Sequence, residues 1–436
     1  MQSHYRNWFP LIVAAILTMS SFAEAANPCW RSRLAAARAR RCCCDQAAIS
    51  IAPCQIACQP VGEPQASPFV ETAAQTPPDQ SAKPSSEKPE TDPQLAVVKT
   101  TTICPSTVAD ALEWITNHQL PDGSWNFDHT IGPGMQRGSP NPGTLKEAKN
   151  AATALALLSL LGAAQTHKEG QYKDNVQRGL DYLVANLKSK DEGGSFEEPG
   201  GSMYSHGLAT LALCEAYGMT ADMKLIKPAQ AAIDYIVWAQ DPIGGGWRYT
   251  ARMPGDTSVF GWQFAALKSA QLAGLDVPAA TIAKATEYLD SVGADNGAFY
   301  GYTGPARGVS TTAIGLLCRM EMGWDNADAL KTGTEFLAAQ GPSLQRANMY
   351  YNFYATQAMF YHSRKIDDDE AWMAWQKELR DYLIDQQAAE GPAAGSWYFG
   401  HAWSNSAGRL YDTCLATLTL EVYYRHLPLW KKGPPE

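Results

Sequence analysis

The chain has 436 residues, of which 45% are hydrophobic, and a formal net charge of −9. This length allows two or three domains, and the mildly acidic balance lacks the basic excess that is typical of nucleic-acid-binding proteins. We therefore expect no nucleic-acid partner.

Residues 1–25 have the pattern of a secretory signal peptide. Arg6 precedes an apolar run over residues 8–19, and residues 23–25 read Ala-Glu-Ala, as at a cleavage site. The run is shorter than the ~20 apolar residues of a membrane span, and Cys29 lacks the small residues that precede a lipid-anchored cysteine. We expect an exported protein, periplasmic or secreted, with no transmembrane segment.

Residues 26–104 are predicted to form a disordered segment, rich first in Arg and Cys and then in Pro. The proline-dense tract over residues 60–99 is too poor in hydrophobic residues to offset the entropy of ordering. Six of the ten cysteines precede this tract. In an oxidising compartment they can form disulfides, including bonds to a partner chain. A metal site is the alternative, although no histidine lies nearby and the adjacent cysteines 42–44 make poor chelate geometry.

From residue 107 onward one unit recurs six times: an amphipathic helix, a turn, a loop and a more apolar helix. The expected pairs are 107–162, 175–218, 228–274, 279–323, 330–363 and 371–426. Five turns read Asp122-Gly-Ser-Trp125, Gly193-Gly-Ser-Phe196, Gly244-Gly-Gly-Trp247, Asn296-Gly-Ala-Phe299 and Gly395-Ser-Trp397, and the copy around residues 340–352 lacks the Gly and the Trp. Self-similarity at a regular spacing indicates a repeat architecture.

The two helices of a pair differ in polarity. Residues 175–187 combine a charged face with an apolar stripe, whereas residues 151–161 carry no charge. A helix that is apolar on every face must be buried. Six alternations predict an inner ring of parallel helices within an outer ring, an all-α (α/α)6 toroid over residues 105–430. A linear helical solenoid is the alternative, but it would need a polar outer face on its last repeat, and residues 415–424 are not polar.

The turns carry a specific resemblance. Gln119-Leu-Pro-Asp-Gly-Ser-Trp125 resembles the Q-x3-G-x-W turn of squalene-hopene and oxidosqualene cyclases, and residues 240–247 are a variant one residue longer. Residues 253–262 resemble the stretch that carries the D-x-D-D-T-A signature of those cyclases. Over residues 107–426 the chain is thus similar to the terpene cyclase and protein prenyltransferase superfamily, with its squalene cyclase-like, prenyltransferase and squalene oxidase repeats. Such a resemblance implies the fold more strongly than the activity.

The resemblance implies a catalytic position at Asp256. Protonating cyclases use the third position of D-x-D-D as the general acid, but Gly255 occupies it here and only the fourth position, Asp256, is acidic. Asp256 is therefore either an acid–base group or the N-cap of the following helix. His206 and Asp412, both near the start of inner helices, complete the candidate catalytic set.

Metal chemistry has weaker support. Asp412-Thr-Cys414 has the Asp-x-Cys spacing of the zinc site in protein prenyltransferase β subunits. Zinc needs at least three protein ligands, and His206 across the ring is the only third candidate. The acidic residues 367–370 fail to complete a DDxxD box and suit a helix N-terminus instead. We expect no metal and no cofactor.

Arginines and aromatic residues gather in the loops before the inner helices. Five of these six loops carry an arginine: Arg137, Arg252, Arg307, Arg346 and Arg409. In a toroid these loops meet at one rim with the helix N-termini, which favours anion binding. Local pairs, Arg252 with Asp256 and Arg409 with Asp412, are the alternative. The ligand-binding candidates also include Trp247, Trp262, Tyr302, Tyr351 and Trp403. Such rings either contact a ligand or fill gaps between helices.

The main functional hypothesis is an exported toroid that binds, and as an enzyme would transform, an isoprenoid-like or amphiphilic small molecule without the D-x-D-D acid. As an enzyme it would be a terpenoid cyclase-like isomerase or intramolecular transferase. One alternative is a non-catalytic interaction or scaffold protein of the envelope, without the thioester pattern C-G-E-Q. The other is a carbohydrate-processing (α/α)6 enzyme, which needs a carboxylate pair. A deep polar cleft would favour this last alternative, and a filled core would favour the scaffold.

Overall fold

The computed structural model describes residues 105–422, which contain twelve α-helices in six consecutive pairs. The predicted signal peptide, the Pro-rich segment and the N-terminal cysteines with their expected disulfide-linked partner lie outside these residues. The first helices of the pairs are α2 (Pro105–Asn117), α4 (Lys173–Asn186), α6 (Met223–Ala239), α8 (Ala279–Val292), α10 (Ala327–Gln340) and α12 (Glu370–Gln386). The second helices are α3 (Lys149–Gly162), α5 (Ser202–Thr220), α7 (Thr257–Leu272), α9 (Val309–Glu321), α11 (Met349–Ile366) and α13 (Ala402–Glu421).

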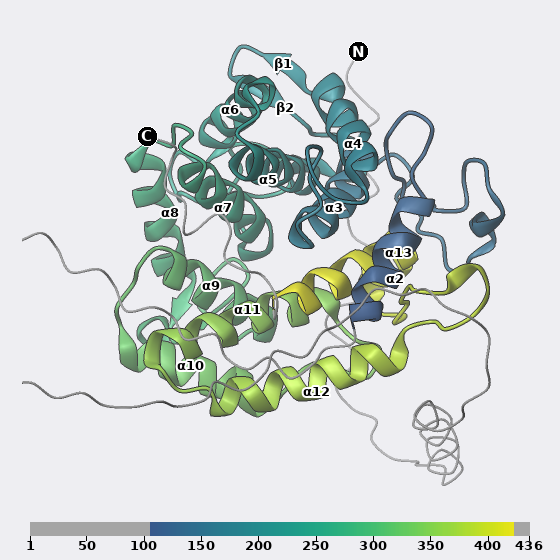
Figure 1. The fold of residues 1–436 in the computed structure, drawn as a ribbon. Coiled ribbons are helices and arrows are strands. Elements are labelled where there is room, and N and C mark those ends of the chain that lie inside the picture. Colours follow the sequence, from purple (N-terminus) through teal and green to yellow (C-terminus); the bar gives the residue numbers. More distant parts are fainter. Residues whose placement is uncertain (1–104, 423–436) are drawn as a thin grey trace, which may run out of the picture. The chain divides into compact units, whose positions relative to one another are not determined.

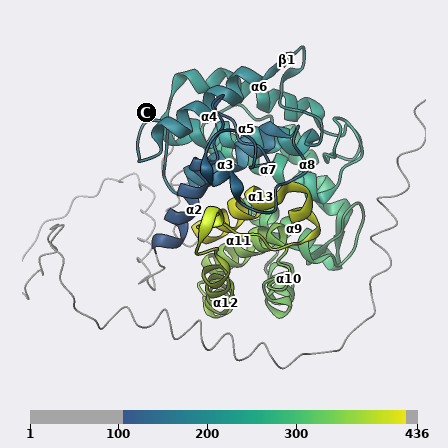
Figure 2. The same cartoon turned by 90° about the vertical axis from the view of Figure 1, so that its right-hand side faces the viewer.

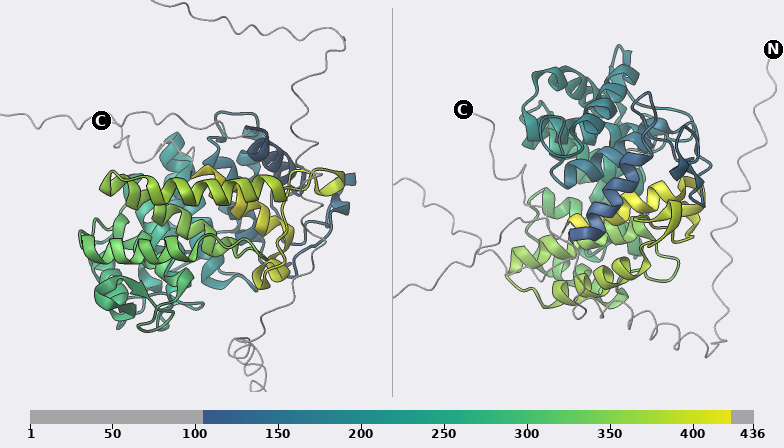
Figure 3. Two further views of the ribbon diagram at one scale, coloured as in Figure 1. Left: turned by 90° about the horizontal axis from the view of Figure 1, so that it is seen from below. Right: turned by 45° about the vertical axis from the view of Figure 1, so that its right-hand side comes forward.

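The second helices form a closed inner ring. Each of α3, α5, α7, α9 and α11 contacts the next, and α13 returns to contact α3. The first helices surround this ring, as Figure 1 shows for α4, α6, α8, α10 and α12. Two further directions of view place α10 and α12 at the periphery (Figures 2 and 3). The fold is therefore the expected (α/α)6 toroid, and the contact between α13 and α3 excludes a linear solenoid.

Burial follows the polarity difference read from the sequence. In α3, 12 of 14 residues are buried, whereas the equally long outer helix α4 buries only Val176, Gly179, Leu180 and Leu183. The inner helix α3, with no charge after its first residue, thus lies in the core, and the amphipathic helix α4 exposes its charged face to water. Among residues 105–422, none of the helices is long and apolar enough to cross a bilayer.

Small strands and turns connect the helices. Strand β1 (Lys188–Lys190) pairs antiparallel with β2 (Gly193–Ser195), with Lys188 opposite Ser195. Strand β3 (Gly293–Ala294) pairs antiparallel with β4 (Phe299–Tyr300). Three short 3₁₀ helices lie at Met135–Gly138, Asp295–Gly297 and Gly391–Ala393.

The Q-x3-G-x-W turns join neighbouring repeats. Gln119 donates through Nε2 to the carbonyl of Gly123 in its own turn and to that of Asn175 in the next outer helix, both at 2.9 Å. Two other glutamines make the same pair of bonds: Gln240 to Gly245 and Thr281, and Gln387 to Gly395 and Thr107. We call this pair of bonds the glutamine clasp. It explains why the motif marks the fold, because each copy satisfies two carbonyls at a junction between repeats.

The tryptophan of the turn anchors it to the preceding outer helix. The indole Nε1 of Trp125 donates to the carbonyl of Ile115 at 2.7 Å. Trp247 and Trp397 make the same bond, to Ile236 and Leu383. All three rings are fully buried. An indole supplies a large apolar surface and one donor, so it can fill the gap between a pair of helices and bind the last turn of the first one.

The inner helices are parallel. The Tyr204 hydroxyl, near the start of α5, donates to the Ser258 hydroxyl at the start of α7 at 2.7 Å, and Tyr350, at the start of α11, donates to the Ser258 carbonyl at 2.7 Å. At the other end, Gly162 of α3 lies against the carboxylate of Glu421 in α13. We call the end that carries the helix N-termini and their preceding loops the mouth.

Candidate functional site

The mouth contains a groove of about 610 Å³, which is open to solvent. It lies beside the first residues of α9, α11 and α13. The side chains that line it are mostly polar: Ser310, Gln340, Ser343, Gln345, Arg346, Asn348, Tyr351 and His401, with Val309, Gly341, Pro342 and Ala402. Two of the ligand-binding candidates from the sequence, Arg346 and Tyr351, are therefore in one groove.

Arg346 connects the two walls of the groove. Its Nε and Nη2 donate to the carbonyl of Gly400 at 3.0 and 2.8 Å, so the loop before α11 is joined to the loop before α13. On the same side, the hydroxyl of Tyr351 donates to the carbonyl of Gly341 at 3.0 Å, which fixes the turn at the end of α10.

His401 is a groove residue that the sequence analysis did not select. Its Nδ1 accepts from the amide of Trp403 at 3.5 Å, so it caps α13 and Nε2 carries the proton of the neutral ring. Burial and the neighbouring Arg346 guanidinium lower the pKa of His401 below its ordinary value. The ring is therefore a neutral hydrogen-bond donor at pH 7. Only its position beside an arginine from another repeat makes it notable, and the sequence does not show that proximity.

Asp412 supports the wall that carries His401. Its Oδ2 accepts from the amide of Phe399 at 2.8 Å and its Oδ1 from the hydroxyl of Ser404 at 2.8 Å. The carboxyl is fully buried, and burial raises its pKa to about 7 against the opposing effects of these two bonds and of Arg409. Asp412 thus fixes residues 399–404 through hydrogen bonds from the buried side of this segment. It has a pKa suited to proton transfer, but no exposed oxygen.

Asp256 is the N-cap of α7. Its Oδ1 accepts from the amides of Ser258 and Val259 at 3.0 and 2.9 Å, as the N-cap interpretation predicts. The alternative local pair of Arg252 with Asp256 is wrong, because the guanidinium that faces Oδ2 is that of Arg248, at 3.7 Å. Arg252 instead donates to the carbonyl of Trp238 at 2.9 Å.

Arg248 belongs to an aromatic platform on the same rim. Its guanidinium lies 5.8 Å from the ring of Tyr249 and 5.9 Å from that of Tyr302, and the two hydroxyls are hydrogen-bonded at 2.6 Å. Tyr302 is 40% exposed. Tyr204 continues the row inward, with its ring 6.0 Å from that of Tyr249. Tyr302 is thus at the surface of the mouth, as a ligand-binding residue requires.

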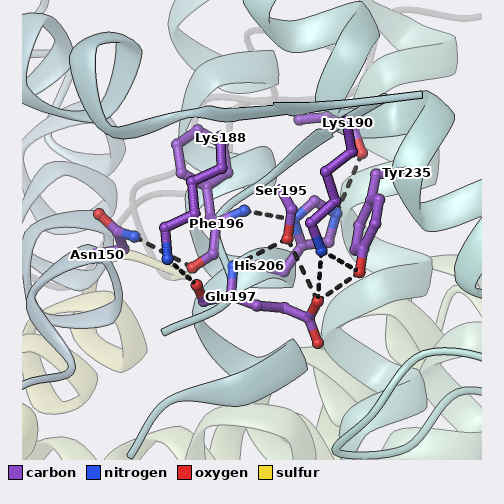
Figure 4. Close-up of polar contacts among 9 residues, drawn as sticks. Asn150, Lys188, Lys190, Ser195, Phe196, Glu197, His206 and Tyr235 are labelled. Atoms are coloured by element: carbon purple, nitrogen blue, oxygen red, sulfur yellow. Dashed lines mark hydrogen bonds and ion pairs between the residues drawn. The ribbon is translucent and has the colours of Figure 1, made fainter. Parts of the chain in front are cut away.

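His206 lies away from both of these groups, at the β1–β2 hairpin (Figure 4). Its Nδ1 accepts from the amide of Phe196 at 3.2 Å and its Nε2 donates to the carbonyl of Ala232 at 3.1 Å. Burial lowers the pKa of His206 to about 3. Beside it, the ammonium of Lys190 lies 4.5 Å above the ring of Tyr235, whose hydroxyl donates to Glu197.

The repeats give the role of this histidine. In three other repeats an amide at this turn donates to a threonine hydroxyl at 3.0 to 3.1 Å: Trp125 to Thr153, Trp397 to Thr413 and, one residue beyond Phe299, Tyr300 to Thr312. His206 replaces that threonine as the acceptor. Both of its ring nitrogens are engaged by the backbone, and the structure does not bring it together with Asp256 or Asp412.

The five rim arginines do not converge on one point. Arg137 is buried and donates to the carbonyls of His118, Gln119, His129 and Pro133. Arg409 is buried as well and donates to Pro140, Ser396 and Asn141. Arg307 is exposed and pairs with Asp295 at 2.8 Å. The alternative local pairing of Arg409 with Asp412 is electrostatic: the guanidinium opposes the rise that burial causes in the pKa of that carboxyl, whose hydrogen-bond donors are Phe399 and Ser404. Arg346 is the rim arginine that lines the groove.

The aromatic candidates have different positions. Trp247 is a core residue of its turn, and Trp262 is buried with its ring 5.4 Å from that of Phe353. Trp403 is 59% exposed and follows the groove residue Ala402. Of the five aromatic residues, Tyr302, Tyr351 and Trp403 are therefore at the mouth, whereas Trp247 and Trp262 fill space between helices.

The axis of the toroid holds a small cavity of about 70 Å³, lined by residues of all six inner helices. Its polar lining includes Glu215, Lys268, Ser269, Glu321 and Tyr354. Burial raises the pKa of Glu321 to about 7. The volume is far below the roughly 300–1,000 Å³ of small-molecule sites. The cavity can therefore hold a few water molecules, but not an isoprenoid chain.

Metal ligands do not group in the part of the chain that the structure describes. No three side chains among the His, Cys, Asp and Glu residues of 105–422 are arranged to bind an ion. Cys214, Cys318 and Cys414 are buried free thiols, as small apolar residues of the inner helices would be.

The comparisons with known proteins identify the fold. The sequence matches no known protein-family model and no curated protein. The structure is similar to cellobiose 2-epimerase from Bacillus thermoamylovorans, with a TM-score of 0.52 and 10% identity over 73% of this chain and 98% of that one. It is also similar to the GH76 α-mannanase from Bacteroides thetaiotaomicron, with a TM-score of 0.51 and 11% identity over 74% and 96% of the chains. These similarities establish an (α/α)6 toroid.

The superfamily resemblance is supported only at the level of this fold. A protein geranylgeranyltransferase-I from Candida albicans has a TM-score of 0.44 and 12% identity over 64% of this chain and 85% of that one. This value is too low to support an inference about terpene cyclase or prenyltransferase ancestry.

Proposed function

We propose that this toroid binds a carbohydrate in the mouth groove. The observation that carries the proposal is the groove itself: it is open, has a volume of about 610 Å³, and presents hydroxyl, amide, imidazole and guanidinium groups together with apolar surface. Its volume lies within the range of small-molecule sites. Polar lining of this kind suits a polyhydroxylated ligand better than an acyl or isoprenoid chain.

Aromatic residues at the mouth fit the same ligand. Tyr351 lines the groove and Trp403 lies beside it, 59% exposed. The apolar face of a sugar ring packs on an aromatic ring, while its hydroxyls bond to the polar groups around it. The similar (α/α)6 toroids include a cellobiose 2-epimerase and an α-1,6-mannanase crystallised with α-1,6-mannotriose, which adds support from a shared fold alone.

The proposal is for binding, and His401 adds a group that can transfer a proton. Hydrolysis of a glycosidic bond uses two carboxyl groups that flank it, and among the described residues that line the groove none is Asp or Glu. Asp256 and Asp412, the sequence candidates for such a pair, are both fully buried. The group in the groove that can take part in proton transfer is the His401 ring, because its Nδ1 accepts from the Trp403 amide and its Nε2 carries the N–H.

The isoprenoid or amphiphile hypothesis gains no support. It requires a large apolar chamber on the axis, and the cavity there has only about 70 Å³. The non-catalytic interaction protein of the envelope is the other remaining hypothesis. This filled core favours it, and so does the apolar side chain of Ile243, which is 93% exposed at a turn. Export, on which the envelope role depends, remains a prediction from residues 1–25.

The test is binding of α-1,6-mannotriose and cellobiose, and of a wider glycan array, to the full chain. We expect binding that Ser310→Trp removes, because Ser310 lines the groove and an indole would fill it. The matched control is Ser189→Trp, an exposed position of β1 outside the groove. Failure of every glycan to bind, or binding that Ser310→Trp leaves intact, would refute the proposal and favour the interaction protein.

A further inference from the structure

We propose that the groove selects an acidic carbohydrate, and that Arg346 and His401 bind the carboxylate of a uronic-acid-type sugar. This inference rests on the proposed function and makes its ligand class specific. It starts from an unbalanced charge: Arg346 lines a groove in which no described acidic side chain does, and the neutral ring of His401 adds an N–H donor.

Arg346 has donors to spare. A guanidinium carries five N–H groups, and the two bonds to the Gly400 carbonyl use Nε and one N–H of Nη2. The end-on edge, with one N–H each on Nη1 and Nη2, is the fork that matches a carboxylate. Within residues 105–422, Arg346 has no acidic partner, whereas the exposed rim residue Arg307 has Asp295. The bonds to Gly400 also hold the guanidinium in one orientation.

His401 adds a second donor from the facing loop. Its Nδ1 is occupied by the Trp403 amide, which leaves the N–H of Nε2 for a ligand. His401 and Arg346 line the same groove, and among the described residues the Arg346 charge adds to burial in lowering the pKa of this ring. A carboxylate bound between them would therefore replace a repulsion between two donors by two charge-assisted hydrogen bonds.

The start of α9 contributes the same sign of potential. Val309 and Ser310 line the groove, and the N-cap, Gly308, has no side chain to cap the helix. The first amides of a helix lack intrahelical acceptors and carry a partial positive charge. Together with Arg346 and His401, this helix end makes the groove favourable for a negative group.

The size of the groove indicates a sugar acid and not an inorganic anion. Sulfate or phosphate would occupy a small part of about 610 Å³. The remaining lining, with Ser343, Asn348 and Gln345 at the loop before α11, offers hydroxyl and amide partners for the hydroxyls of a sugar ring.

The backbone conformation at Arg346 allows the side chain to be removed without strain. Its φ is 48°, in the left-handed region that glycine adopts without strain, so Arg346→Gly removes the side chain without imposing a new conformation. Arg252 is the matched control: it is also an exposed rim arginine with a positive φ, 61°, bonded to a backbone carbonyl, but it lies outside the groove. Arg252→Gly therefore changes the net charge and the backbone freedom by the same amount as Arg346→Gly does.

The experiment measures binding of the full chain to oligosaccharides supplied as pairs, each a uronate-containing glycan and its carboxyl-reduced neutral counterpart. Inorganic phosphate and sulfate serve as competitors. We expect the acidic member to bind about tenfold or more tighter, as a charge-assisted pair implies. Arg346→Gly should reduce this ratio to near one, and Arg252→Gly should leave it unchanged.

Each other result has a definite meaning. Equal binding of the acidic and neutral members overturns this inference while leaving carbohydrate binding intact. A preference for the acidic glycan that survives Arg346→Gly also overturns it, because other residues would then bind the carboxylate. Displacement of the glycan by millimolar phosphate alone would identify a simple anion site and reject the sugar acid. Absence of binding to every glycan refutes the proposed function together with this inference.

Discussion

The side chain of Gln387 donates a hydrogen bond of 2.8 Å to the carbonyl of Thr107, which joins the last repeat of the toroid to the first. Gln119 makes the same bond between the first and second repeats, and Gln240 between the third and fourth. The junction that closes the ring is therefore built like the junctions within it. The closed form depends on a few side-chain amide groups, which are buried or partly buried, as well as on apolar packing.

Removing the closing clasp should destabilise the toroid. Gln387→Ala leaves the carbonyls of Thr107 and Gly395 without their donor, and a buried carbonyl without a partner costs about 1–3 kcal/mol. We expect a corresponding decrease in the free energy of unfolding in urea. Gln386→Ala, at the exposed neighbouring position, is the control and should have almost no effect. Equal stabilities of the two variants would contradict the clasp.

The glycine of the clasp should be intolerant of any side chain. Gly395 has a φ of 85°, and an added Cβ would collide with the carbonyl of Asp110 in α2. Gly391 has a φ of 69° but open space around it. Gly391→Ala should therefore cost only the ~1 kcal/mol of backbone strain. Gly395→Ala should cost clearly more, and the difference between the two melting temperatures measures the contact between repeats.

The sequence predicts this architecture well because the relevant signals are local and repeated. The charge-free run over residues 151–161 requires burial, and the amphipathic run over residues 175–187 requires a solvent-exposed face. Their alternation along the chain predicts two rings. The role of the glutamine is not visible in the motif, because its acceptor belongs to the next repeat.

The site is predicted poorly for a related reason. Arg346, His401 and Asp412 come from different segments of the last two repeats, and only the structure shows that the first two share one groove. Arg252 and Asp256 are close in sequence, yet the Arg252 guanidinium donates to the carbonyl of Trp238, and Arg248 faces the aspartate. Arg137 and Arg409 are buried with their guanidinium groups bonded to backbone carbonyls and, for Arg409, to the side-chain oxygens of Ser396 and Asn141, a condition that residue type does not reveal.

His206 should act as a structural acceptor and not as a catalytic base. Thr and Val have the same shape, but only Thr can accept a hydrogen bond from the Phe196 amide, as Thr153 does for Trp125. We expect His206→Thr to be about 1–3 kcal/mol more stable than His206→Val in chemical denaturation. Ligand binding at the mouth should be the same in both variants. Loss of binding in His206→Thr, with its fold intact, would restore a functional role.

Acid should destabilise the folded protein through its buried histidines. Burial lowers the pKa of His206 to about 3 and that of His129 to about 4, from an ordinary value near 6.5. The fold therefore holds them neutral, and the unfolded chain takes up protons first as the pH falls below 6.5. Stability should be full above pH 6.5 and should decrease between pH 6.5 and 3.

The thermal unfolding of His206→Thr tests this assignment. Its melting temperature should fall less than that of the wild type between pH 7 and pH 4, because one of the two histidines is gone. Parallel pH profiles for the two proteins would attribute the acid sensitivity to other groups.

The bond between Gln387 and Thr107 spans 280 positions of the chain. Helix α2 contacts both α3 and α13, and on the ribosome α13 is the last helix of the toroid to emerge. The first repeat must therefore wait with one face uncovered while the other five are synthesised. Ring closure thus requires α13, and a chain that is cut short before it leaves the apolar surfaces of its first and last repeats uncovered.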